Sequence, residues 1–120
     1  MKPQSAKNKG RLGQQEVVRK ILSFFVGILT KHDVRSTSMG CPGDDIQFSE
    51  KGIEYLPWHV EVKRKKRIAA VRFIEQAKGR KDELEPVVFM REDCKPGKPK
   101  QWYALVEADY LLSLLKGEKP

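Results

Sequence analysis

The chain has 120 residues and a mass of 13.8 kDa, the size of one ordinary domain. A folded chain of this mass buries roughly two thirds of its extended surface, so a core forms without disulfide or metal staples. The only cysteines are Cys41 and Cys94 and the only histidines His32 and His59, a set without zinc-finger spacing or a disulfide framework. The longest nearly apolar run, residues 21–29, is too short to span a bilayer, and no apolar signal segment is present. We therefore expect a soluble, cytoplasmic protein that does not bind membranes.

Basic side chains outnumber acidic ones by 24 to 16, and they are concentrated in two blocks. Residues 1–20 hold six basic and one acidic side chain, and residues 60–81 hold nine basic and two acidic ones. Clustered Lys and Arg displace condensed counterions from a phosphate backbone, so the blocks predict a nucleic-acid partner. The alternative is a solvated face that only keeps the protein in solution.

The first half of the chain predicts a flexible basic arm followed by a long helix. Residues 1–11 form the arm, in which Lys9 and Arg11 are candidate DNA contacts, and a single domain follows over residues 12–117. Apolar residues recur at helical spacing over residues 12–30. A short strand at residues 33–35 and a turn-rich loop at residues 36–43 come next.

The second half alternates between strand and helix patterns. Residues 45–48 and 59–63 alternate polar and apolar, and residues 49–58 between them are long for a hairpin loop, so they either wander or carry their own structure. A helix is expected at residues 67–78, followed by strands at residues 86–90 and 101–106. A last helix is expected at residues 108–116. The order α-β-β-β-α-β-β-α predicts an α/β (α+β) fold with a mixed β-sheet flanked by helices.

Side-chain alternation along the strands singles out three residues with catalytic potential. Val60 and Val62 fit the buried face, so Glu61 and Lys63 point the same way on the other. The same argument puts Asp45 opposite Glu61 across the hairpin and leaves Asp44 to the turn. Two carboxylates beside a lysine suit Mg²⁺, which takes one or two carboxylates together with phosphate oxygens, and this set predicts phosphodiester hydrolysis. Glu61 and Lys63 alone also fit an ordinary surface charge pair.

Basic and hydroxyl side chains near these residues are candidates for holding a DNA backbone. Ser36 and Ser38 either bind a phosphate or serve only as turn residues. The remaining candidates are Arg64, Lys65, Lys66 and Arg67, which directly follow the lysine, and Arg35 on the first strand.

Gly43-Asp44-Asp45-Ile46, followed by Glu61-Val62-Lys63 and a helix with Glu75-Gln76, resembles the PD-(D/E)XK nuclease superfamily. The segments Lys9-Gly10-Arg11, Gln15-Glu16-Val17 and residues 34–40 resemble, more narrowly, small phage-encoded nucleases similar to Holliday junction resolvases. The proline that names the superfamily is absent, since Gly43 and Asp44 stand there instead.

The resemblance implies a single-domain, restriction-endonuclease-like core and a Mg²⁺- or Mn²⁺-dependent endonuclease, often dimeric, that acts in DNA recombination on branched or duplex DNA. It implies Asp45, Glu61 and Lys63 as the catalytic core, Glu16 as a further acidic metal ligand and Gln76 as a residue facing the active site. In a phage-encoded protein the location would be the host cytoplasm. From the residues alone, Glu16 also fits a solvated glutamate paired with Lys20, and Gln76 a surface amide.

Two other classes of function compete with a nuclease. A non-catalytic nucleic-acid-binding module would use the basic blocks alone, but it gains nothing from carboxylates that face a polyanion without a metal. An adaptor domain would need an exposed apolar surface, for which Tyr55, Leu56 and Trp58 are candidates.

Overall fold

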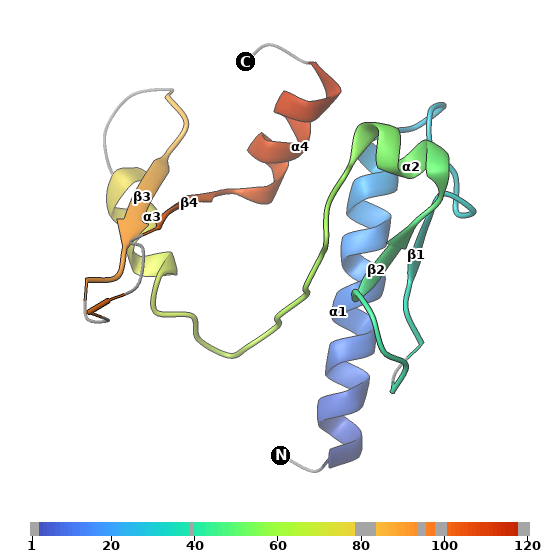
Figure 1. Ribbon diagram of the computed structural model, residues 1–120, viewed down its shortest axis with the longest axis horizontal. Helices are drawn as coiled ribbons and strands as arrows, with labels where there is room; N and C mark the ends of the chain where they lie inside the picture. Colours follow the sequence, from blue (N-terminus) through green and yellow to red (C-terminus); the bar gives the residue numbers. More distant parts are fainter. Residues whose placement is uncertain (1–2, 39, 79–83, 94–95, 98–100, 118–120) are drawn as a thin grey trace. The chain divides into compact units, whose positions relative to one another are not determined.

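The computed structural model describes residues 3–38, 40–78, 84–93, 96–97 and 101–117, and for residues 3–7 it describes the backbone alone. These residues form α1 (Pro3–Phe24), β1 (Val34–Ser36), β2 (Ile46–Phe48), α2 (Glu50–Tyr55), α3 (Val71–Lys78), β3 (Val87–Arg91), β4 (Trp102–Val106) and α4 (Ala108–Lys116) (Figure 1). The expected mixture of helices and strands is confirmed. The described strands form two antiparallel pairs, β1–β2 and β3–β4, instead of the one mixed sheet that we expected.

The chain divides into two compact units. The first contains residues 1–66 and 112–120, and the second contains residues 67–111. The last turns of α4 therefore belong to the first unit, where Leu112 is buried in the core.

Helix α1 is the longest element of the first unit and differs from the expected helix at both ends. It begins at Pro3, so residues expected in a flexible arm are helical; proline suits this position because its missing N–H would have no partner there. It ends at Phe24 instead of Thr30. Gly27 adopts a φ of 80°, in the left-handed region that favours glycine, and the amide of Leu29 donates to the carbonyl of Phe25 at 2.9 Å.

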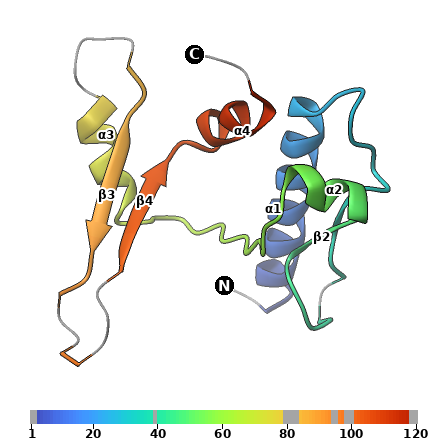
Figure 2. The same cartoon turned by 45° about the horizontal axis from the view of Figure 1, so that its top comes forward.

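One face of α1 packs against the β1–β2 hairpin, and this contact is the core of the first unit. In the hairpin, Val34 pairs with Phe48 and Ser36 with Ile46. Figures 1 and 2 both show the hairpin and α2 alongside α1. The buried apolar side chains are Ile21, Phe25, Leu29, Val34, Ile46, Leu56 and Leu112.

Residues 49–58 carry their own structure, the short helix α2. Ser49 caps this helix, because its Oγ accepts the amide of Gly52 at 3.0 Å while donating to Asp33 Oδ1 at 2.7 Å. Asp33 Oδ2 also accepts the amide of Thr30 at 2.8 Å. The bond from the Thr30 amide is the main reason that the pKa of Asp33 lies below its ordinary value, and the bond from Ser49 is the second. Asp33 thus joins the turn after α1 to the start of α2.

The strand expected at residues 59–63 is reduced to a single antiparallel bridge between Ile46 and Val60. Next to this bridge the amide of Val62 donates to a side-chain oxygen of Asp45, at 2.7 Å, instead of to a backbone carbonyl. A side chain that takes an amide in this way competes with ladder formation, which explains why the strand does not continue.

The second unit consists of α3, the β3–β4 hairpin and the start of α4. Helix α3 begins at Val71 instead of Arg67. The residues before it form a turn in which the amide of Val71 donates to the carbonyl of Ile68 at 3.1 Å. Lys78 Nζ, at the end of α3, donates a hydrogen bond to Glu107 Oε2 at 3.0 Å. This hydrogen bond is the main reason that the pKa of Lys78 is raised. Strands β3 and β4 lie within one residue of the expected bounds at each end, and α4 has the expected bounds. Among the described helices none combines the length and apolarity needed to cross a bilayer.

Candidate metal and nucleic-acid site

Asp45 lies in contact with the segment that contains Glu61 and Lys63. Its Oδ2 accepts the amide of Val62, the residue between those two, at 2.7 Å, and its own amide donates to the carbonyl of Val60 at 3.0 Å. The carboxylate is half-buried, so these bonds fix its position in a partly water-excluded place. The aspartate and the Glu-x-Lys segment, separate in the sequence, are therefore neighbours in space.

Glu61 and Lys63 point away from the core, as alternation predicted. Val60 and Val62 are half-buried and pack against the core of the first unit. Glu61 Oε2 and Lys63 Nζ are 3.5 Å apart, and each side chain is 68% exposed. An ion pair this open to water is weakly held, so both groups can exchange partners when a charged ligand arrives.

Helix α1 passes close to the same segment near Gly13. A methyl group at Gly13 would be 3.4 Å from Arg64 Cβ and 3.6 Å from Val62 Cγ1, so the helix and the segment are in van der Waals contact. One turn later, Glu16 Oε1 lies 3.4 Å from Arg64 NH1. Glu16 therefore pairs with the first residue of the basic run.

The donor set at this place fits a hard divalent cation. Asp45 and Glu61 offer carboxylate oxygens, the ligands that Mg²⁺ and Mn²⁺ favour, and one oxygen of Asp45 is not used by Val62. In the part of the chain that the structure describes, no three His, Cys, Asp or Glu side chains are grouped so as to hold an ion together. Glu16, the third carboxylate that the resemblance implies as a ligand, is paired with Arg64 in this structure.

The predicted DNA contacts are mostly open to solvent. Ser36 is half-buried where β1 ends, and Thr37 after it binds the carbonyl of Asp44 through its hydroxyl. Lys9 on α1 is also half-buried. The exposed ones are Arg11, Arg35, Ser38, Arg64, Lys65, Lys66 and Arg67, of which Arg67 belongs to the second unit.

Asp44, assigned from the sequence to the turn, binds a histidine. Its Oδ2 lies 2.7 Å from Nδ1 of His59, and this hydrogen bond, together with the charge of Asp44, raises the pKa of His59. The two adjacent aspartates therefore have different partners. Nothing in the sequence pattern indicates this pair beyond the presence of both residues.

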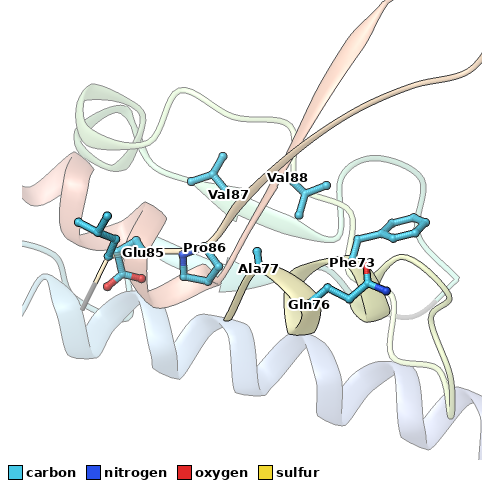
Figure 3. A pocket seen from close by; sticks show the side chains of 8 residues that line it. Phe73, Gln76, Ala77, Glu85, Pro86, Val87 and Val88 are labelled. Atoms are coloured by element: carbon cyan, nitrogen blue, oxygen red, sulfur yellow. The ribbon is translucent and has the colours of Figure 1, made fainter. Parts of the chain in front are cut away.

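Gln76 belongs to the second unit, where it lies on α3 and lines a pocket of about 600 Å³. Figure 3 shows Gln76 beside Phe73, with Pro86, Val87 and Val88 also lining the pocket. Its side chain is exposed, which fits the surface amide interpretation as well as a role in a site.

Gln14, on α1, is a buried polar residue that was not among the predicted site residues. It is 7% exposed, and its Oε1 is buried with no hydrogen-bond partner among the residues that the structure describes. The signal that could have found it is its spacing, since positions 14, 17, 18 and 21 lie on one helical face and only the first is polar. A buried orphan acceptor one turn before Val17 and Val18 is costly for the fold.

We compared the chain with family models, curated proteins and solved structures, and found no match in any of the three.

Proposed function

We propose that this chain is a Mg²⁺-dependent endonuclease that hydrolyses phosphodiester bonds in DNA, with a preference for branched DNA. The observation that carries the proposal is the hydrogen bond from the Val62 amide to Asp45, which joins the aspartate to the Glu61-Val62-Lys63 segment. The resemblance to PD-(D/E)XK nucleases, with a restriction-endonuclease-like core similar to Holliday junction resolvases, rests on the same residues.

Asp45 and Glu61 would hold the ion. Mg²⁺ keeps several waters and is usually bound through one or two carboxylates and substrate phosphate oxygens, so two carboxylates are sufficient. When bound, the ion supplies polarisation of the scissile phosphate and a bound water of lowered pKa. Mn²⁺ would accept the same ligands.

The other groups would position the substrate. Lys63, released from its open pair with Glu61, would orient the attacking water or stabilise charge on the phosphate. Arg64 holds Glu16 at the edge of this site and, with Lys65, Lys66 and Arg67, would bind the DNA backbone. Gln76 and a two-fold dimer belong to the proposal through the resemblance alone.

A non-catalytic DNA-binding module is the second candidate. It is favoured by the pairing of acidic with basic groups, since Glu61 faces Lys63 and Glu16 faces Arg64. Carboxylates neutralised in this way would not repel a polyanion, so they would need no metal to be compatible with DNA binding.

The decisive experiment compares cleavage of labelled four-way junction, linear duplex and single-stranded DNA in Mg²⁺. The variants are Glu61→Gln and Asp45→Asn, which remove charge and keep shape; an asparagine oxygen still accepts the Val62 amide. Glu54→Gln, an exposed carboxylate on α2, is the matched control. Binding is measured in parallel in Ca²⁺ at the same salt concentration.

The proposal predicts metal-dependent cutting by the wild type and by Glu54→Gln, none by the other two variants, and DNA binding by all four proteins. Equal cutting of duplex and junction would support the proposed nuclease activity but contradict the proposed preference for branched DNA. Salt-dependent binding without cleavage, unaffected by Glu61→Gln, would establish the binding module instead.

A further inference from the structure

The first unit has a second feature, a pocket of about 390 Å³ beside the candidate site. Its lining includes the aromatic residues Phe48, Trp58 and His59, the polar residues Arg35 and Gln47, and the exposed Ile53. The volume lies near the lower end of the range for small-ligand sites. Neither the proposed metal ligands nor the basic run line it.

The pocket's lining includes Asp44 and His59, which stand one residue before Asp45 and two residues before Glu61. Arg35 and Gln47 are register partners in the hairpin, and both are exposed while their neighbours Val34 and Ile46 are buried. His59 and Glu61 both alternate with the core-facing Val60, so they too point outwards together. Residues two apart on an extended chain are about 7 Å apart. A ligand in the pocket therefore lies next to the proposed scissile phosphate.

The lining selects the chemistry of the ligand. Asp44 is also part of the wall and would repel a bare phosphate, while Arg35 and Gln47 make a purely apolar occupant unfavourable. Among the described residues no ion pair or hydrogen bond engages the side chain of Arg35 or Gln47, so donors and an acceptor are free. Aromatic faces combined with free donors and acceptors suit a flat heterocycle with polar edges.

We propose that this pocket receives one unpaired base of the DNA substrate, next to the phosphate at Asp45 and Glu61. The inference rests on the proposed function and deepens it, because it supplies a physical basis for structure selectivity. A base in a continuous duplex must leave the stack to enter, whereas a base already unpaired at a branch or bulge does so at little cost.

The test measures binding without metal, in EDTA, so that it does not depend on catalysis. One duplex carries a single unpaired 2-aminopurine as a bulge, and the second is the same duplex without the bulge. The variants are Arg35→Ala and Gln47→Ala, both at exposed positions, which avoids the core contacts of Trp58. Arg19→Ala, an exposed arginine on α1, is the control for loss of one positive charge.

We expect the wild type to prefer the bulged duplex by about fivefold or more, the range that stacking of one base on an aromatic side chain provides. The 2-aminopurine fluorescence should be quenched on binding. Both pocket variants should lower the preference, because the polar edges of the base lose a hydrogen-bonding partner, whereas Arg19→Ala should weaken binding to the two duplexes equally.

Two outcomes would overturn the proposal that the pocket binds a base. One is equal affinity of the wild type for the two duplexes, and the other is an unchanged preference for the bulged duplex in both pocket variants. Cleavage of the four-way junction in Mg²⁺, measured separately, distinguishes this failure from failure of the proposed nuclease. A protein that cuts the junction without preferring the bulge would support the nuclease and contradict the proposal for the pocket. A protein that prefers the bulge and cuts no DNA would support the proposal for the pocket and contradict the proposed nuclease.

Discussion

Gly52→Ala tests the packing that holds α2 on the hairpin of the candidate site. A Cβ at Gly52 would lie 2.7 Å from the carbonyl oxygen of Asp33 and 3.1 Å from Phe48 Cβ. A carbon and a carbonyl oxygen normally approach to about 3.3 Å, so α2 must move by about 0.6 Å. The Asp33 oxygen cannot turn aside freely, because it accepts the amide of Ser49 at 2.9 Å.

The magnitude follows from two opposing effects. Overpacking of a close contact costs about 1–3 kcal/mol, and a fixed backbone atom places this site in the upper part of that range. Alanine in place of glycine within a helix offsets about 1 kcal/mol of the loss. We expect a net loss of about 1–2 kcal/mol, which lowers the melting temperature by roughly 5–15 °C in a unit of this size.

The assay is thermal and urea unfolding followed by circular dichroism, with Gly13→Ala as the matched control. Gly13 is also a helical glycine, but its added methyl group would meet its neighbours at 3.4 Å or more, an ordinary contact. Gly13→Ala should therefore be neutral or stabilising. Equal stability of Gly52→Ala and the wild type would refute the close approach of α2 to Asp33.

Three further predictions concern a carboxylate, a buried amide and the basic run. The pKa of Asp33 is lowered in the folded state, so its contribution to stability is present above the ordinary value of about 3.9 and is lost as the pH falls through the folded pKa. Melting curves should therefore show the wild type more stable than Asp33→Asn at pH 6, with the difference shrinking below about pH 4; a constant difference would contradict this. Gln14→Met removes the buried orphan oxygen and should raise the free energy of unfolding by about 1 kcal/mol in urea titrations, and a loss of stability would show that the oxygen has a partner. Replacing Arg64, Lys65 and Lys66 by glutamine should flatten the salt dependence of DNA binding by about 0.9 in log–log slope for each phosphate contact removed, and an unchanged slope would place the DNA elsewhere.

Alternation in the sequence was sufficient to predict the exposed and buried faces around the candidate site. Ile46 is buried and Gln47 exposed, and Val60 faces the core while Glu61 faces solvent, as the two-residue period requires. This part of the fold is predictable because burial of one face decides the phase of a strand.

The limits of the elements were less predictable, because they depend on single residues and on tertiary contacts. The apolar pattern of α1 continues past Phe24, but the backbone of Gly27 ends the helix first. The expected strand at residues 59–63 has the alternation of a strand, yet the amide of Val62 donates to the Asp45 side chain instead of to a partner strand. Periodicity reports which face is buried and carries no information on which group takes a given amide.

The bond between Asp45 and Val62 connects these observations to the proposed chemistry. An ordinary strand pair would have used the Val62 amide within the ladder and left Asp45 without this anchor. Because the Asp45 carboxylate accepts the Val62 amide, the strand pairing ends beside Glu61. The same hydrogen bond fixes the backbone that carries the exposed side chains of Glu61 and Lys63. Removal of the side chain in Asp45→Ala should therefore disturb the position of Glu61 as well as the charge, whereas Asp45→Asn changes the charge alone. A larger loss of DNA binding in Asp45→Ala than in Asp45→Asn, both measured in Ca²⁺, would support this dual role, and identical binding by the two variants would exclude it.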